Sequence, residues 1–171
     1  MKQTIPTIIV AEQESTAELI KHYFDEFKGF SFLANTSDFS KAYNGVKELT
    51  NSLVIVDISE YPEQALNFIS KITTEFPNCK VVALSDKPDV DLVIRAMRVG
   101  ATEFLPLPLI KKDFFDVLAK LYNDFTGGKP KKSKCRVITV YSNKGGVGKT
   151  SIATNLALEL SKITKENVAL I

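Results

Sequence analysis

A glycine-rich segment near the end of the chain carries the residues best suited to hold a phosphate. It reads Asn-Lys-Gly-Gly-Val-Gly-Lys-Thr over residues 143–150. Glycines let backbone N–H groups approach an anion closely, and the N-terminus of a following helix adds partial positive charge. Lys149 supplies a mobile cation, and the hydroxyl of Thr150 can reach a phosphate-bound Mg²⁺. The segment therefore predicts a nucleotide site whose amide cradle is Gly145, Gly146, Val147, Gly148, Lys149, Thr150 and Ser151.

The residues around this segment predict the structural context that such a loop needs. The apolar run RVITVYS (136–142) predicts a strand before it, and SIATNLALELS (151–161) predicts an amphipathic helix after it. The final residues ENVALI (166–171) predict a second strand. Asn143 stands where the general G-x-x-x-x-G-K-[ST] pattern has its first glycine, so the segment departs from that pattern at one position.

A second set of polar residues follows the predicted strands of the first 125 residues. Asp57 ends the apolar run SLVIVD, Ser85 ends KVVALS, and Glu12 follows the first strand. The carboxyl ends of parallel strands meet at one edge of a sheet, where ligands of open α/β sheets gather. We therefore expect these three side chains to lie close together.

Composition excludes several other classes of site and protein. The net charge of +2 gives no argument for nucleic acid or a membrane surface. Cys79 and Cys135 lie far apart without metal-ligand spacing, which favours a reducing cytoplasm. The one histidine, His22, has polar neighbours and is expected at the surface, so no Ser-His-Asp or Cys-His set can be assembled. The N-terminal apolar run reads as a strand, and no run is long enough to span a bilayer.

The elements that must position these residues alternate regularly between strand and helix. The predicted strands are 7–11, 30–35, 52–57, 80–85 and 102–107, and the predicted helices are 15–27, 38–49, 63–76, 88–99 and 111–125. Ser15 and Glu18 are spaced as a capping box, Pro62 suits the first turn of a helix, and Gly100 suits a helix end. Five β–α units predict an α/β fold with a five-stranded parallel doubly wound sheet. We expect domains at 1–125 and 136–171, joined by a Gly-, Pro- and Lys-rich linker at 126–135.

Order and spacing over residues 5–125 resemble the flavodoxin-like receiver domain of bacterial response regulators. The resemblance gives Asp57 the place of the phosphoacceptor, Ser85 that of the phosphate-binding hydroxyl, and Phe104 that of the aromatic residue on the fifth strand. Ala11 stands where an acidic residue is expected, which leaves Glu12 as the one carboxylate on the metal side, and Leu107 replaces the lysine before proline. Since phosphoryl transfer needs Mg²⁺ and a local cation, these departures favour a receiver fold reused for protein contacts. The alternative is a phosphorylation-responsive regulator with Asp57 as acceptor.

The segment Lys-Gly-Gly-Val-Gly-Lys-Thr resembles the deviant Walker A motif of the MinD/ParA superfamily of ATPases. The resemblance implies ATP and Mg²⁺ as cofactors, with Lys149 on the β- and γ-phosphates and Thr150 on the metal. It makes Lys149 and Lys144 the catalytic residues, with Lys144 acting across a dimer interface on the partner's nucleotide. The 36 residues from Arg136 to the end would be only the first β-α-β of such a domain. We therefore expect the full-length protein to be an ATPase and these 171 residues alone to be inactive.

A degenerate receiver followed by a MinD-like motif resembles the CpaE/TadZ family, which localises the assembly machinery of pili. The resemblance implies a nucleotide-linked homodimer that contacts pilus or secretion assembly proteins or a polar landmark. It implies a cytoplasmic protein recruited to the pole or to the inner face of the membrane, with any membrane-targeting helix beyond residue 171. A DNA-partitioning ATPase of the ParA type is a further alternative, supported only by the linker lysines.

Overall fold

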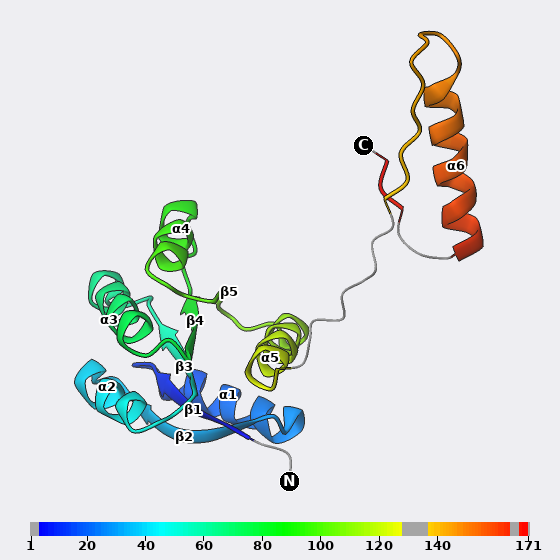
Figure 1. Cartoon of the computed structure of the whole chain (residues 1–171). Coiled ribbons are helices and arrows are strands. Elements are labelled where there is room, and N and C mark those ends of the chain that lie inside the picture. Colours follow the sequence, from blue (N-terminus) through cyan, green and yellow to red (C-terminus); the bar gives the residue numbers. More distant parts are fainter. Residues whose placement is uncertain (1–3, 128–136, 165–167, 171) are drawn as a thin grey trace. The chain divides into compact units, whose positions relative to one another are not determined.

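The computed structural model describes residues 4–127, 137–164 and 168–170, which fall in two compact units, Met1–Lys131 and Lys132–Ile171. The first unit is a five-stranded parallel sheet in the order β2-β1-β3-β4-β5 (Figure 1). Its strands are β1 (Ile5–Val10), β2 (Phe30–Thr36), β3 (Ser52–Asp57), β4 (Cys79–Ser85) and β5 (Glu103–Pro106). The predicted fold class is confirmed for this unit.

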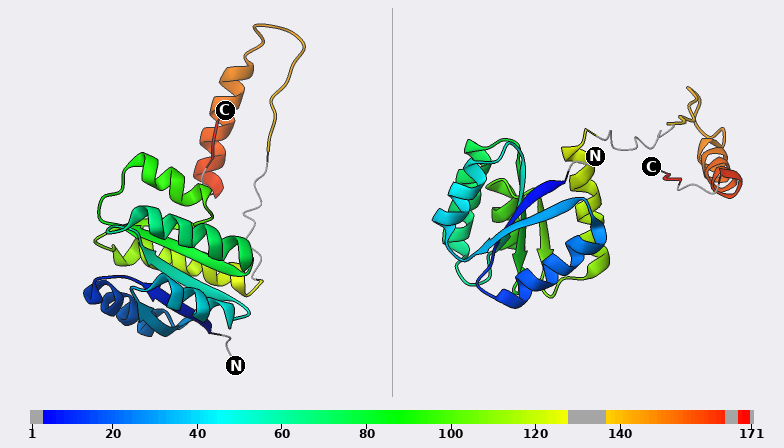
Figure 2. Two further views of the ribbon diagram at one scale, coloured as in Figure 1. Left: turned by 90° about the vertical axis from the view of Figure 1, so that its left-hand side faces the viewer. Right: turned by 90° about the horizontal axis from the view of Figure 1, so that it is seen from below.

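Helices cover both faces of the sheet, as Figure 2 shows. The helices of this unit are α1 (Glu14–Phe27), α2 (Phe39–Lys47), α3 (Pro62–Glu75), α4 (Val90–Arg98) and α5 (Lys111–Phe125). Helices α1 and α5 pack on one face, and α2, α3 and α4 pack on the other. In β3, Val54 and Val56 belong to the core under α2–α4, while Leu53 and Ile55 belong to the core under α1 and α5. Both sets are fully buried, which explains why the central strands are continuous apolar runs.

Single residues decide where several helices begin and end. Pro62 occupies the first turn of α3, as predicted, because its missing N–H has no partner there in any case. Asp38 caps α2 by accepting from the N–H groups of Ser40 and Lys41. The predicted capping box is wrong: Gln13 is the N-cap of α1 and makes no side-chain cap, since the helix begins at Glu14, before Ser15.

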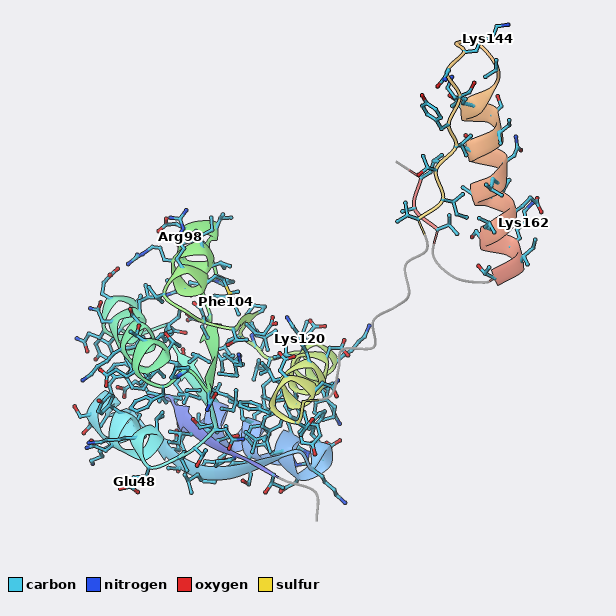
Figure 3. The ribbon with its side chains drawn as sticks, viewed as in Figure 1. Glu48, Arg98, Phe104, Lys120, Lys144 and Lys162 are labelled. Atoms are coloured by element: carbon cyan, nitrogen blue, oxygen red, sulfur yellow. The ribbon has the colours of Figure 1, made fainter. Side chains whose placement is uncertain are left out.

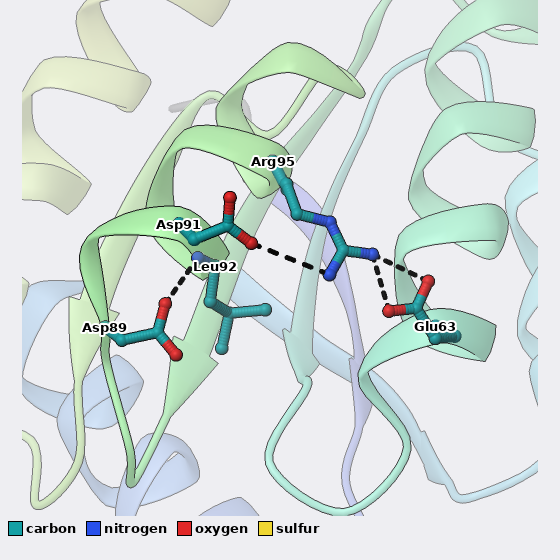
Figure 4. A network of polar contacts seen from close by, with 5 residues as sticks. All are labelled: Glu63, Asp89, Asp91, Leu92 and Arg95. Carbon is teal, nitrogen blue, oxygen red and sulfur yellow. Dashed lines mark hydrogen bonds and ion pairs between the residues drawn. The ribbon is translucent and has the colours of Figure 1, made fainter.

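A polar network holds α4 at its N-terminus and along its length (Figure 4). Asp89 caps the helix, its Oδ1 accepting from Leu92 N at 2.7 Å. Arg95 donates from Nη2 to both carboxylate oxygens of Glu63 on α3, at 2.5 and 2.6 Å. Its Nη1 lies 3.9 Å from Asp91. This network joins α4 to α3 at the surface, above their shared apolar contact.

The second unit contains one described helix, α6 (Lys149–Thr164), preceded by the glycine-rich loop. The helix is confirmed, but the predicted strands are wrong for the residues described here: 137–142 and 168–170 form no strand. A β-strand is defined by its ladder of hydrogen bonds, and neither segment has a paired neighbour. Residues 136, 166, 167 and 171 of these two predictions, and 128–135 of the predicted linker, lie outside the described residues.

Within the described ranges, we find no helix with the length and apolar character needed to cross a membrane.

Candidate functional site

A small pocket at the carboxyl ends of β1 and β3 brings together part of the predicted carboxylate site. Asp57 ends β3 and is half-buried, whereas Glu12 follows β1 and is exposed. Both line a pocket of about 20 Å³, together with Ser59 and Glu60. Such a volume has room for about one water molecule. Glu12 and Asp57 therefore line the same pocket.

The Asp57 carboxylate accepts hydrogen bonds from the loop that follows β3. Its Oδ1 accepts from the backbone N–H of Ser59 at 3.0 Å and from the Ser59 hydroxyl at 2.5 Å. The Ser59 Oγ in turn accepts from Asp86 N at 3.1 Å, in the loop that follows β4. The carboxylate thus fastens the β3–α3 loop and, through Ser59, the β4–α4 loop.

Ser85 and Phe104 occupy other surroundings. Ser85 is buried at the end of β4 and does not line the pocket; its Oγ accepts from Lys87 N at 3.2 Å. Phe104 on β5, labelled in Figure 3, is half-buried and packs against the core under α2–α4. The structure therefore brings Glu12 and Asp57 into one pocket without Ser85.

The positions that depart from the receiver pattern are apolar in the structure as well. Ala11 is 5% exposed and belongs to the core under α1 and α5. Leu107 packs against the same core, and the Leu107–Pro108 peptide bond is cis. The charged residues lining the pocket are all acidic, Glu12, Asp57 and Glu60, with no cation among the lining residues. A transferring phosphoryl group would therefore meet negative charge without compensation.

The described parts of the chain hold no cluster of three His, Cys, Asp or Glu side chains that could bind a metal ion. Mg²⁺ keeps several waters and is usually bound by one or two carboxylates together with substrate phosphates. The side chains that could contribute to such a site here are the carboxylates of Glu12 and Asp57.

Ser59 and Glu60 are among the pocket residues that sequence reasoning missed. Their signal was available, because both follow the strand-end Asp57 directly in the loop to Pro62. A serine two positions after an aspartate commonly bonds back to that carboxylate through its N–H and hydroxyl. That local rule would have predicted the contact observed here.

Other groups able to titrate near neutral pH or act as nucleophiles are not arranged for chemistry. His22 is exposed, as predicted, with its Nε2 3.5 Å from Glu26. Burial raises the pKa of the Cys79 thiol to about 11, which leaves almost no thiolate at neutral pH. Cys135 lies outside the described residues.

The glycine-rich loop turns sharply between residue 142 and α6. Gly146 and Gly148 have φ values of +73° and +79°, the left-handed region that favours glycine. A Cβ added at either glycine would meet no atom within 4 Å, so conformation and not crowding requires glycine at 146 and 148. Lys144 N donates to the Ser142 hydroxyl at 3.2 Å, and Lys144 lies at the tip of the loop in Figure 3.

The predicted phosphate-binding residues are brought together around this turn. Helix α6 begins at Lys149, so its free N–H groups lie directly after the loop. The Lys149 ammonium folds back and donates to Lys144 O at 2.9 Å. The side chain of Lys149 is half-buried, whereas Thr150 and Ser151 are exposed. Glycines in the left-handed region, a helix N-terminus and a lysine are the features from which phosphate-binding loops are built.

Comparison with known proteins identifies the first unit. The family described as "Response regulator receiver domain" matches residues 7–119. The chain belongs to this family. The match covers the sheet from β1 to β5 and most of α5, and it does not extend to the glycine-rich loop.

Two curated relatives are regulators. Over 104 residues the chain is 24% identical to "Transcriptional regulatory protein MalR" of Bacillus subtilis, covering 61% of this chain and 44% of that protein. It is 19% identical over 104 residues to "Probable C4-dicarboxylate response regulator DctR" of Halalkalibacterium halodurans, covering 61% and 45%. The chain thus spans less than half the length of either relative.

Solved structures share the fold of the first unit. A response regulator from Thermotoga maritima superposes with a TM-score of 0.64 at 27% identity, covering 71% of this chain and 99% of that one. A protein described as pilus assembly-related, from Burkholderia pseudomallei, gives 0.64 at 15% identity, covering 71% and 92%. One described as a pilus assembly protein (cpaE), from Burkholderia thailandensis, gives 0.62 at 16% identity, covering 69% and 98%. At these identities the two Burkholderia structures show the fold alone.

Proposed function

We propose that the protein is an ATP-dependent spatial regulator of a pilus or secretion assembly, with its receiver domain serving as an interaction module. The observation that carries the proposal is the glycine-rich loop, in which two left-handed glycines lead into α6 and the Lys149 ammonium bonds back to Lys144 O. The sequence of the loop supports the same assignment, because Lys144 and Lys149 both match the deviant Walker A pattern. The fold shared with the two Burkholderia proteins agrees with the pilus-assembly branch of the proposal.

Each residue of the loop has a role in this proposal. The amides from Gly145 to Ser151 cradle the phosphates, and Lys149 exchanges its bond to Lys144 O for the β- and γ-phosphates. Thr150 is the protein ligand of the nucleotide-bound Mg²⁺. The exposed Lys144 reaches the nucleotide of a second subunit, so that ATP joins two copies into a dimer. The dimer would be the state recruited to the pole or the inner face of the membrane.

The receiver domain contributes contacts and not phosphoryl transfer. Asp57 is bonded to Ser59, and its pocket has neither a cation nor a metal-binding group of side chains among the described residues. Such a domain keeps the surface of the fold while losing its chemistry, and its partner is an assembly protein or a polar landmark.

Dimerisation tests the proposal. The molar mass of the full-length gene product is measured by light scattering with ATP-Mg and with ADP-Mg, for the parent, Lys144→Ala and Lys149→Ala. The parent is expected to dimerise only with ATP, Lys149→Ala to fail through loss of nucleotide, and Lys144→Ala to bind nucleotide as a monomer. The proposal is wrong if both variants dimerise with ATP as well as the parent does.

A phosphorylation-responsive regulator is the second candidate, and membership of the receiver family favours it. It places the phosphoryl group on Asp57. Incubation with acetyl phosphate and Mg²⁺ would then add one phosphoryl group, seen by intact mass, and Asp57→Asn would abolish it. We expect no modification of the parent under conditions that fully modify a receiver with an intact acidic pair and lysine.

A further inference from the structure

A groove of about 310 Å³ lies between α2 and α3; it shares one lining residue, Phe39, with the small pocket at Asp57. We call it the α2–α3 groove. Its lining includes Phe39, Tyr43, Asn44, Asn67, Phe68 and Lys71. Its volume is at the lower end of the range for ligand-binding clefts. It offers three kinds of surface to a ligand: aromatic, carboxamide and cationic.

The aromatic surface is held in place from both helices. The rings of Phe39 and Phe68 lie 5.2 Å apart between centroids, and Phe68 is 6% exposed. The Tyr43 hydroxyl donates to Glu75 Oε2 at 2.5 Å, and the Tyr43 ring lies 5.6 Å from that of Phe76. The groove therefore presents an apolar wall that needs no rearrangement before a ligand binds.

Lys71 gives this groove a positive charge without an acidic partner. Its Nζ lies 4.0 Å from the centroid of the Tyr43 ring, an arrangement that positions the ammonium over the aromatic face. Among the described residues, no carboxylate lies within ion-pair distance of Lys71. An anionic group of a ligand can therefore pair with Lys71 without breaking an existing ion pair.

Carboxamides supply the polar contacts of the groove. Asn44 on α2 and Asn67 on α3 are both exposed and both line it. A carboxamide carries a donor and an acceptor, the same pair that a peptide group presents. Side chains of this type on both walls match an extended main chain better than they match an isolated anion.

We propose that the α2–α3 groove binds an extended segment of a partner protein that carries a large apolar residue and an acidic residue two positions apart. Phe68 and Lys71 are three residues apart on α3, about 5 Å along its axis. In an extended peptide, residues i and i+2 point to the same side about 7 Å apart. One side chain can then rest on Phe39 and Phe68 while the carboxylate meets Lys71.

Nuclear magnetic resonance of the uniformly ¹⁵N-labelled 171-residue chain tests this proposal without nucleotide. The probes are acetyl-Leu-Ala-Asp-amide, its reverse acetyl-Asp-Ala-Leu-amide, and the charge-swapped acetyl-Leu-Ala-Lys-amide. We expect one acidic probe to give saturable shifts at amides of α2 and α3 with a millimolar dissociation constant. Lys71→Glu should weaken that probe at least ten-fold and favour the lysine probe instead. Lys41→Glu, an equal charge change on α2 outside the groove, should leave the dissociation constant within two-fold of the parent value.

Three results would overturn the proposal. The first is that neither acidic probe gives saturable shifts at the groove up to 20 mM. The second is that Lys71→Glu binds the acidic probe as tightly as the parent does. The third is that free acetyl-aspartate binds as tightly as the acidic probe, which would make the ligand a small anion. Because no ATP is present, each of these results leaves the nucleotide proposal intact, and a failure of ATP binding leaves this groove untouched.

Discussion

At the scale of single residues, the most informative change from the receiver pattern is what surrounds Asp57. A carboxylate at the end of a central strand is retained, yet Ala11 and Leu107 place apolar groups at the positions of an acid and a lysine. Ser59 takes up one oxygen of the carboxylate and links it to the next loop. Asp57 thus has a structural role in holding these two loops.

Ser59→Ala tests that structural role. Removing the hydroxyl takes away the short bond to Asp57 and the acceptor for the Asp86 N–H. We expect the free energy of unfolding to fall by about 1 kcal/mol, the usual net worth of such a bond. Amide hydrogen exchange should accelerate at Asp86, whereas Ser70→Ala on α3 should leave exchange at Asp86 unchanged. Equal protection of Asp86 in the parent and Ser59→Ala would show that the contact does not fasten the loop.

The sequence predicted only part of the carboxylate site, because it shows the order of residues but not the direction of each side chain. The types and order of Glu12, Asp57 and Ser85 could be read directly, because strand ends are visible in the apolar pattern. The direction in which Ser85 points could not, since its hydroxyl bonds to Lys87 N within its own turn. Ser59 was predictable from local turn chemistry, but a search for family positions passes over it.

At the scale of elements, periodicity predicted five strands and five helices because each element has neighbours that bury it. Val54 and Ile55 of β3 lie between β1 and β4 with helices above and below. The apolar run in the sequence therefore reflects burial on both faces of the sheet. Residues 137–142 have the same apolar character but no paired strand, and they form none. Val137 is 86% exposed there. Composition records a tendency to form a strand, and the partner decides whether one forms.

Gly100 shows how one residue sets the boundary between α4 and β5. Its φ is +107°, and an added Cβ would collide with the Thr73 side chain, which is anchored to Ile69 O at 2.8 Å and Val99 O at 3.0 Å. We expect Gly100→Ala to lower the free energy of unfolding by about 3 kcal/mol, from backbone strain and overlap together. Gly127→Ala is the matched control, because its φ is +65° and its Cβ would meet no atom within 4 Å. That control should cost about 1 kcal/mol. Equal losses in chemical denaturation would contradict the role of Thr73.

The ion pair between α3 and α4 predicts a pH dependence with a defined sign. The hydrogen bond from Arg95 lowers the pKa of Glu63 below its ordinary value of 4.5. Stabilisation by this pair is therefore present above about 4.5 and lost as the pH falls through the lower folded-state pKa. We expect the difference in stability between the parent and Arg95→Gln to be small at pH 7, because both side chains reach solvent, and to shrink as the pH is lowered below 4.5. Arg98→Gln on the same helix should show no such change in urea denaturation; a difference for Arg95→Gln that stays constant as the pH falls further below 4.5 would rule out the pair as its source.

At the scale of the whole molecule, the chain combines a receiver domain, whose pocket at Asp57 has no cation among its lining residues, and a glycine-rich loop that leads into α6. The first unit carries its own core on both faces of the sheet. In the second unit the described residues of α6 are not buried, and Ile152, Leu158 and Ile163 are more than half exposed. We accordingly assign protein contacts to the first unit and nucleotide binding to the second.

Binding of ATP-Mg tests the central claim most directly. Isothermal titration of the full-length gene product with ATP-Mg is compared for the parent, Lys149→Ala and Lys162→Ala, which removes an equal charge from the far end of α6. The account predicts saturable binding by the parent and by Lys162→Ala, and at least a hundred-fold weaker binding by Lys149→Ala. A parent that takes up no ATP-Mg, or a Lys149→Ala variant that binds as tightly as the parent, would contradict it.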